Sequence, residues 1–313
     1  GDLSASVRCF ACRPLPTMSV LDFFKPYASG DGPWPPVKPQ PDVGHGWWDS
    51  IGKRDERTQN WLWVATPYPT IIISILYVFG VLFLLRFMRD REPYDLRTAI
   101  KVHNLFLILL SAWMSYTLIT EAWALGHVHV FVCNKLDRTE RGHMLARALH
   151  VFYLSKCIEM GDTVFMCLRK KTRQVSFLHV YHHFMTFLLW WIGAHFAAGG
   201  DSYFSAFLNT FVHVVMYTYY LAAAFDIQVP FKKYITQFQM FQFFLNICHC
   251  SIGAFTGCGT EDNPAWMYWG MIIYMISFLG LFYAFYRSTY GGKKGKKGES
   301  GAKSGKPKAK KAD

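Results

Sequence analysis

The sequence predicts an all-α membrane protein with about seven transmembrane helices. Of its 313 residues, 52% are hydrophobic and only 17% are charged, whereas about 25% of the residues in a soluble domain are usually charged. The apolar residues gather in long runs that are separated by short polar loops. This composition and clustering exclude a disordered chain and a small secreted domain held together by disulfides.

Seven apolar runs are long enough to cross the hydrocarbon core of a bilayer, which takes about 20 residues. The first and last runs are cleanly apolar, whereas the five between them contain His, Asn, Gln, Lys, Glu and Asp. Such groups are costly at membrane depth, so they should face a protein interior. The predicted spans are residues 67–88, 102–125, 145–168, 175–197, 203–225, 233–257 and 265–289.

The predicted helical domain covers residues 67–290, between two segments of different composition. Residues 1–66 are rich in Pro, Gly and Trp and form a separate N-terminal segment, predicted to be lumenal. Residues 291–313 contain nine Lys against two acidic residues, and this net charge of +7 without large apolar side chains predicts a disordered basic tail. Because no aromatic residue is interleaved with the lysines, we expect no nucleic-acid binding.

Basic residues in the loops orient the predicted spans, since positively charged loops stay in the cytosol. They gather in the first, third and fifth loops and in the tail, while the fourth and sixth loops have none. The second loop breaks the pattern mildly with three basic residues, although Asp137 and Glu140 balance part of their charge. The N-terminus is therefore predicted to be lumenal and the C-terminus cytosolic. In this orientation Cys133 and Cys258 lie in two lumenal loops, where an oxidising compartment permits a disulfide, although two free thiols fit the sequence equally well.

Polar side chains recur at helical spacing in four consecutive spans, and each cluster occupies one face of its helix. A lone polar residue in a span often serves helix packing. So many ionisable groups facing one interior would be a costly way merely to pack helices, and they predict a functional site. The clustered residues are Lys156, Glu159, Asp162 and Thr163; His179, His182 and His183; Asn209, His213, Met216, Tyr217 and Tyr220; and Gln237, Gln239, Gln242, Asn246 and His249.

Metal ligation is one chemistry that clustered histidines allow. Iron-dependent membrane desaturases and hydroxylases use several histidine boxes, whereas this chain has one complete box, HVYHH, on a span. We therefore expect no metal site, and an iron-dependent desaturase or hydroxylase is the alternative hypothesis. A non-enzymatic seven-span receptor or channel is a third hypothesis, suggested only by the number of spans.

The favoured chemistry is acyl transfer on an imidazole ring. Burial disfavours the charged form of histidine, and a neutral ring nitrogen can attack a thioester to give a reactive acyl-imidazole. A second histidine can take up and deliver the proton. Cys157 is a rival nucleophile on the third span, but no histidine adjacent in the sequence would activate it.

Four ordered motifs, KxxExxDT, HxxHH, NxxxHxxMYxYY and TQxQxxQ, resemble those of the ELO family of fatty-acid elongases, and the resemblance extends over residues 67–290. It implies a seven-helix endoplasmic-reticulum protein whose inner helices enclose a long, narrow acyl-CoA tunnel. The implied activity is 3-oxoacyl-CoA synthesis, in which acyl-CoA condenses with malonyl-CoA and CO2 and CoA are released, with no cofactor. The resemblance also favours pairing of Cys133 with Cys258.

The resemblance implies a role for each matched residue. His182 is the expected nucleophile, and His213 is its proton shuttle and stabilises the reacting carbonyl. His179 and His183 orient the site, with Asp162 and Asn209 supporting it. The expected substrate-binding residues are Lys156, Glu159, Tyr217, Tyr220, Gln239 and Gln242, together with Arg169, Lys170, Lys171, Lys232 and Lys233 for the CoA phosphates. Setting the membrane topology is the alternative role of these five basic residues.

Localisation and partners follow from the same resemblance. Lys310 and Lys311 have the KKxx form of an endoplasmic-reticulum retrieval signal, which requires a cytosolic C-terminus. HVYHH after QVSFL resembles the family branch that acts on polyunsaturated or very long chains, because the other branch tends to carry Trp after the first His. The expected partners are acyl-CoA, malonyl-CoA, membrane lipids and the reductases and dehydratase that follow in the elongation cycle, and a homodimer is compatible with this picture.

Overall fold

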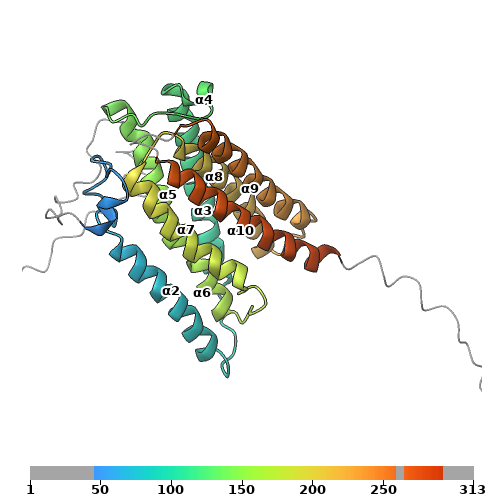
Figure 1. Ribbon diagram of the computed structural model, residues 1–313. Coiled ribbons are helices and arrows are strands. Elements are labelled where there is room, and N and C mark those ends of the chain that lie inside the picture. The colour runs from blue at the N-terminus through green and yellow to red at the C-terminus, as the bar shows by residue number, and fades with distance from the viewer. Residues whose placement is uncertain (1–45, 259–263, 292–313) are drawn as a thin grey trace, which may run out of the picture. The chain divides into compact units, whose positions relative to one another are not determined.

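The computed structural model describes residues 46–258 and 264–291, and this part of the chain is helical without a β-strand (Figure 1). The predicted all-α fold is thereby confirmed, while the basic tail with Lys310 and Lys311 lies outside the described residues. Short helical segments are η1 (Trp47–Ser50), α4 (His127–Val130) and η2 (Glu140–Gly142). The longer helices are α2 (Tyr68–Phe87), α3 (Arg97–Ala124), α5 (His143–Glu159), α6 (Gly161–Leu168), α7 (Phe177–Phe196), α8 (Ser202–Ala224), α9 (Lys232–Phe255) and α10 (Ala265–Tyr290).

Five of these helices close into a ring. Helix α7 packs on α5 and α10, α10 packs on α9, and α8 packs on both α9 and α5. Helix α2 covers α6 and α7 from outside the ring, as Figure 1 shows, and α3 packs against α5 and α8. The predicted polar clusters lie on the ring helices α5, α7, α8 and α9, except for Asp162 and Thr163, which lie on α6 next to the ring.

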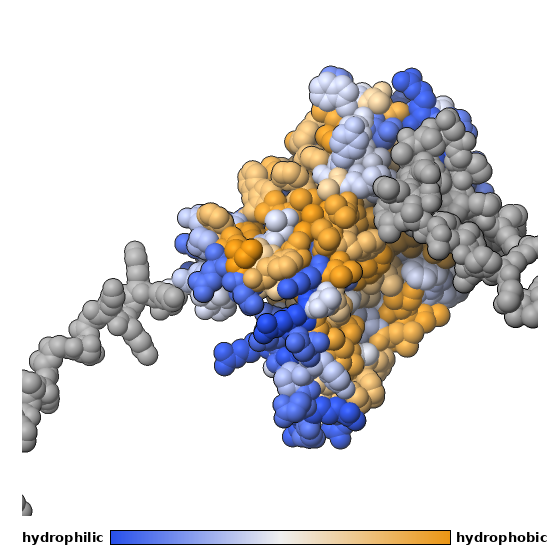
Figure 2. Space-filling model, turned by 180° about the vertical axis from the view of Figure 1, so that it is seen from behind, coloured by the Kyte–Doolittle hydropathy of each residue, from blue (hydrophilic) through white to orange (hydrophobic). Residues whose placement is uncertain are grey.

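The outer helix faces are apolar and exposed. On α2, Ile72, Leu76, Phe79 and Phe83 each expose 54–65% of their surface. Soluble proteins rarely expose apolar surface on this scale, whereas a bilayer covers it. Figure 2 shows apolar residues over most of the middle of one face and hydrophilic residues gathered mainly toward its upper and lower ends. The chain is therefore an integral membrane protein.

Within the described ranges, three helices, α2, α3 and α10, are both long and apolar enough to cross a membrane. The remaining long helices carry the buried polar clusters, which lower their mean hydropathy. Those polar groups find partners inside the ring, so their helices need not be apolar on every face. The number of seven crossings stays a prediction.

The third predicted span is two helices rather than one. Helix α5 ends at Glu159 and α6 begins at Gly161, with Met160 as the joint between them. A Cβ atom on Gly161 would lie 3.2 Å from Cε1 of His103 on α3. The missing side chain of Gly161 therefore leaves space for the imidazole of His103. The sequence pattern, examined one span at a time, does not reveal this contact between helices.

The described part of the N-terminal segment, residues 46–66, packs against the helices. The side chain of Arg57 is buried and forms an ion pair of 2.6 Å with Asp55. The guanidinium also donates to the carbonyl oxygens of Asp137 at 2.6 Å and Ala198 at 2.8 Å. These bonds tie residues 46–66 to the loop before α5 and to the end of α7.

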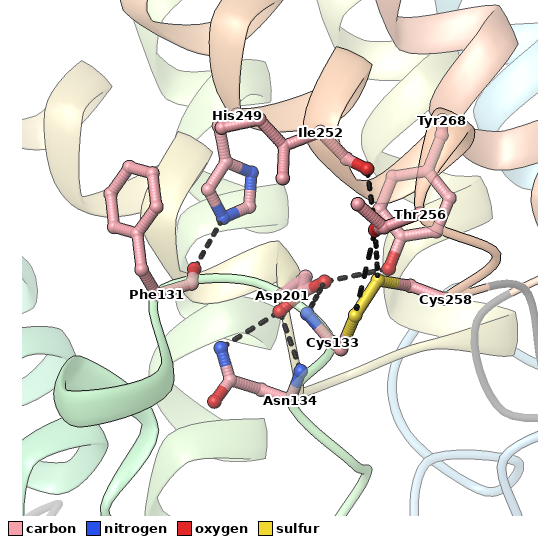
Figure 3. The surroundings of a disulfide bond; sticks show 9 residues. All are labelled: Phe131, Cys133, Asn134, Asp201, His249, Ile252, Thr256, Cys258 and Tyr268. Atoms are coloured by element: carbon pink, nitrogen blue, oxygen red, sulfur yellow. Dashed lines mark hydrogen bonds between the residues drawn. A yellow bond between two sulfur atoms is a disulfide. The ribbon is translucent and has the colours of Figure 1, made fainter.

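A disulfide joins Cys133, after α4, to Cys258, after α9, with 5.0 Å between their Cα atoms (Figure 3). The buried carboxylate of Asp201 lies beside it and accepts four hydrogen bonds of 2.6–2.9 Å, from the Cys133 N–H, the Tyr268 hydroxyl, and the backbone and side-chain N–H groups of Asn134. Four donors satisfy a carboxylate that has lost its hydration. We call this side of the ring the disulfide end, and the side with the loops 88–96, 169–176 and 225–231 the basic end.

Replacing Asp201 with Ala should destabilise the disulfide end, because four donors would lose their acceptor. We expect the free energy of unfolding to fall by about 2–4 kcal/mol, measured as a lower melting temperature of the purified protein in detergent. Asp226→Asn is the control, since the Asp226 side chain is 84% exposed, its ion pair with Arg97 is 3.8 Å long, and Asn tolerates the left-handed backbone at this position. Equal melting temperatures for the two variants would contradict the role given to Asp201.

Candidate active site

A buried ion pair lies inside the helix ring. Nζ of Lys156 is 2.8 Å and 3.1 Å from the two carboxylate oxygens of Glu159, and it also donates to Oδ1 of Asn209 at 2.8 Å. Lys156 and Glu159 are each 1% exposed. Charges at this depth are tolerated only when they are paired and hydrogen-bonded. Because Asn209 comes from α8, the pair also joins α5 to α8.

His213 faces the same carboxylate from α8. Its Nδ1 lies 3.4 Å from Oε1 of Glu159. His213 and Asn209 are one helical turn apart, so the same face of α8 presents both side chains to α5. The ring of His213 also meets the ring of Tyr217 edge-on, with 5.5 Å between the centroids.

Asp162 joins three helices. Its Oδ1 lies 3.1 Å from Nε2 of His103 on α3, and its Oδ2 accepts a hydrogen bond of 2.8 Å from the Tyr217 hydroxyl on α8. Asp162 itself lies in the first turn of α6. Two carboxylates three residues apart, Glu159 and Asp162, therefore each meet an imidazole from a different helix.

The histidine box lies in the first two turns of α7. The Ser176 hydroxyl caps this helix by accepting a hydrogen bond from the N–H of His179. Nε2 of His179 is 2.9 Å from the Thr163 hydroxyl, and the rings of His179 and His183 are 4.6 Å apart. The ring of His182 lies 5.2 Å from that of His183. His183 is buried, whereas His182 is partly exposed to the interior space described next.

His182 lines a narrow cavity of about 20 Å³ between α7, α8, α9 and α10. Two hydrogen bonds lie among its walls, from the Ser205 hydroxyl to Asn246 at 2.8 Å and between the Thr186 and Tyr274 hydroxyls at 2.5 Å. A space that holds about one water molecule admits an acyl chain only if side chains or helices move apart. The other lining residues are Trp190, Asn209, Gln242, Phe243, Met275 and Phe278.

The structure brings His182 and His213 into the same interior. His182 lines the cavity beside Asn209, which accepts a hydrogen bond from Lys156, and the carboxylate paired with Lys156 lies 3.4 Å from His213. Nucleophile and proton shuttle, the roles expected of the two histidines, need this proximity. The same interior holds Asn209 and Gln242 on the cavity wall.

Two of the predicted substrate-binding residues, Gln239 on α9 and Tyr220 on α8, are not among the residues that line the cavity. Gln239 donates its side-chain amide to the sulfur of Met216 at 3.5 Å. Tyr220 is 37% exposed, and its ring meets that of Tyr217 at 5.9 Å. Tyr217 thus links Tyr220 to the interior site through Asp162.

The predicted CoA-binding residues lie at the basic end. Arg169, Lys170 and Lys171 follow α6, and Lys232 and Lys233 begin α9. Nζ of Lys170 donates to the backbone carbonyls of Arg89 and Arg91 at 3.1 Å and 2.8 Å, so this lysine also holds two loops together. Lys171, Lys232 and Lys233 are exposed.

Sequence reasoning missed several residues that the structure adds to the site. Each is a single polar residue in an apolar run, and such residues more often serve helix packing. For His103, an ionisable group at membrane depth was the available signal. The missed residues are Tyr77, which contacts Thr163 at 2.8 Å, and His103, Thr186, Ser205 and Tyr274.

Other histidines serve the structure outside the site. Rings of His150 and His195 lie 3.0 Å and 2.8 Å from backbone carbonyls of residues 46–66, and that of His249 lies 2.9 Å from the Phe131 carbonyl. In the part of the chain that the structure describes, no three His, Cys, Asp or Glu side chains are arranged to hold a metal ion. The geometry therefore lends no support to the iron-box hypothesis.

The apolar outer faces and the interior imidazole–carboxylate site define the class: a polytopic membrane protein with a polar centre enclosed by helices. The chain belongs to the ELO family, described as the GNS1/SUR4 family, whose pattern matches residues 62–298. The family indicated by the motifs is thereby confirmed.

The chain is 40% identical over 242 residues to the human protein named very long chain fatty acid elongase 4, covering 75% of this chain and 76% of the relative. It is 38% identical over 246 residues to mouse very long chain fatty acid elongase 5, covering 78% and 81%.

Removing one partner of the central ion pair should destabilise the protein more than removing both partners. Lys156→Met leaves the buried charge of Glu159 without its ammonium partner, and we expect the free energy of unfolding to fall by about 3–5 kcal/mol. The double variant Lys156→Met/Glu159→Gln removes both charges and should recover most of this loss. Thermal melting of the three proteins in the same detergent measures the difference, and a double variant no more stable than the single one would argue against the pair.

Proposed function

We propose that this chain catalyses the condensing step of fatty-acid elongation, as a very-long-chain 3-oxoacyl-CoA synthase. The substrates of this family are acyl-CoA and malonyl-CoA, and the products are 3-oxoacyl-CoA, CO2 and CoA. One observation carries the assignment of the centre: His182 and Asn209 line the same interior cavity, and Asn209 is hydrogen-bonded to Lys156, whose partner Glu159 lies 3.4 Å from His213. Nucleophile, proton carrier and orienting carboxylate are the parts that acyl transfer needs.

In the first half-reaction, a ring nitrogen of His182 attacks the thioester carbonyl of acyl-CoA. The carbon–sulfur bond breaks and CoA leaves as a thiolate. The proton on the other ring nitrogen passes by way of His213 to the thiolate, so the products are a neutral acyl-imidazole and CoA. Asn209 and Lys156 hold Glu159 and His213 in place while the charge moves.

In the second half-reaction, malonyl-CoA loses CO2 and becomes an enolate. The enolate carbon attacks the acyl carbon, the carbon–nitrogen bond to His182 breaks, and the ring takes up one proton. The release of CO2 draws the condensation forward. One proton is consumed in each turnover. His213 must therefore take up a new proton, either from water at the basic end or through the hydrogen-bonded side chains around it.

Substrate binding divides between two regions. We assign the acyl chain to the cavity between α7, α8, α9 and α10, where burial contributes about 0.8 kcal/mol for each CH2 group. Among the basic residues, Lys171, Lys232 and Lys233 are exposed at the basic end and suit the CoA phosphates. The box HVYHH, without Trp after its first His, supports a preference for polyunsaturated chains.

We further assign the protein to the endoplasmic-reticulum membrane, with a lumenal N-terminus and a cytosolic C-terminus. The disulfide Cys133–Cys258 and the basic loops lie at opposite ends of the ring, which fits an oxidising lumen and a cytosol. The retrieval signal at Lys310 and Lys311 requires the same orientation. The reductases and dehydratase of the elongation cycle would then act on the product at the same membrane, and a homodimer is compatible with the apolar outer faces.

His182→Ala should abolish both turnover and the covalent intermediate, because no other ring in the box lines the cavity. The measurement is intact-mass analysis after exposure to acyl-CoA without malonyl-CoA, where the parent gains the mass of one acyl group. Cys157→Ala is the matched control and should keep the adduct and the activity. An adduct that persists in the His182 variant would reassign the nucleophile.

Condensation by this route needs no redox or metal cofactor, since the carbon nucleophile arises from loss of CO2. Prolonged chelation followed by desalting should therefore leave the conversion of labelled malonyl-CoA to 3-oxoacyl-CoA within about twofold of the untreated protein. Loss of activity that one added transition metal restores would favour metal-dependent chemistry instead.

A further inference from the structure

Two carboxylate–imidazole pairs lie where α5 and α6 meet α3 and α8, and the proposed reaction uses only one of them. Glu159 meets His213 at 3.4 Å, and one helical turn away Asp162 meets His103 at 3.1 Å. Tyr217 connects them, since its hydroxyl donates to Asp162 and its ring lies edge-on to His213. The pair Asp162–His103 is therefore connected to His213, the proposed proton carrier, by one hydrogen bond and one ring contact of Tyr217.

The structure around His103 is shaped to its ring. The side chain is only 14% exposed. Gly161, at the joint between α5 and α6, leaves space beside Cε1 that a Cβ atom would enter at 3.2 Å, and the ring of Phe165 meets the imidazole edge-on at 5.1 Å. The ring of Phe165 and the helix joint at Gly161 thus hold this imidazole against Asp162.

The hydrogen atoms in this cluster can be assigned from donor and acceptor chemistry. An ionised carboxylate only accepts hydrogen bonds. Oδ2 of Asp162 accepts from the Tyr217 hydroxyl, so Oδ1 needs a second donor, which Nε2–H of His103 supplies. With both oxygens engaged, Asp162 has a fixed orientation and holds the Tyr217 hydroxyl at one point.

We propose that His103 is a positioning residue for the condensation: by holding Asp162, and through it Tyr217, it sets the orientation of the His213 ring. This inference rests on the proposed function, in which His213 carries the proton. Tyr217 and His213 are four residues apart on α8, so their rings share one face of the helix. If Tyr217 were released from Asp162, the His213 ring would keep Glu159 on one side but lose its fixed neighbour on the other.

A matched pair of variants separates the hydrogen bond from packing. His103→Gln places an N–H close to the position of Nε2, whereas His103→Met has nearly the same length without a donor. For the Met variant we expect kcat to fall by about 10- to 100-fold while KM for each substrate stays within about twofold, the effect of a misplaced reacting group. For the Gln variant we expect kcat within about threefold of the parent. His129→Met, at an exposed position of α4 at the disulfide end, is the control and should match the parent.

The outcomes discriminate between this inference and the proposed function. A Gln variant no better than the Met variant, at any thermal stability, would overturn the positioning role, and so would parent-like turnover of the Met variant. Gly161→Ala offers an independent test, because the added Cβ displaces the ring without removing it, and kcat should fall while KM holds. A parent protein that forms no acyl adduct at His182 would overturn the proposed function, and this inference with it.

Discussion

The charge of Glu159 inside the helix ring is the constraint on which the centre of this structure depends. Lys156 neutralises it from the same helix, and α8 supplies His213 to the same carboxylate and Asn209 to the ammonium. A carboxylate this deeply buried is stable only if all of these groups are in place. The packing of α5 against α8 therefore depends on these polar contacts as well as on apolar packing.

Two other carboxylates impose the same constraint elsewhere in the fold. Asp162 gathers an imidazole from α3 and a hydroxyl from α8, and Asp201 gathers donors from the disulfide loop and from α10. Each carboxylate therefore joins segments that are far apart in the sequence. Because no water at membrane depth can replace the partners of Glu159 and Asp162, the polar interior holds its geometry while the apolar outer faces meet lipid.

This arrangement separates the histidines by their surroundings. The rings of His213, His103 and His179 are held by Glu159, Asp162 and Thr163, whereas His182 faces the cavity. An imidazole that opens on a cavity can receive an acyl group, and imidazoles fixed by side chains can guide the proton. Because the cavity is so narrow, an acyl chain can enter only when the helices or side chains around it move.

Much of this protein could be predicted from the order of its residues. Long apolar runs predicted helices and a membrane, because the cost of unpaired backbone groups in lipid allows few alternatives, and the helical spacing of Lys156, Glu159 and Asp162 placed them on one interior face. Only the tertiary structure decided which partner each of them meets. His103, Gly161 and Tyr77 carry no periodic signal, and their roles arise where α2, α3 and the joint of α5 and α6 come together. Spacing along one helix determines which face a side chain occupies, but a hydrogen bond between helices depends on packing distances that no single segment encodes.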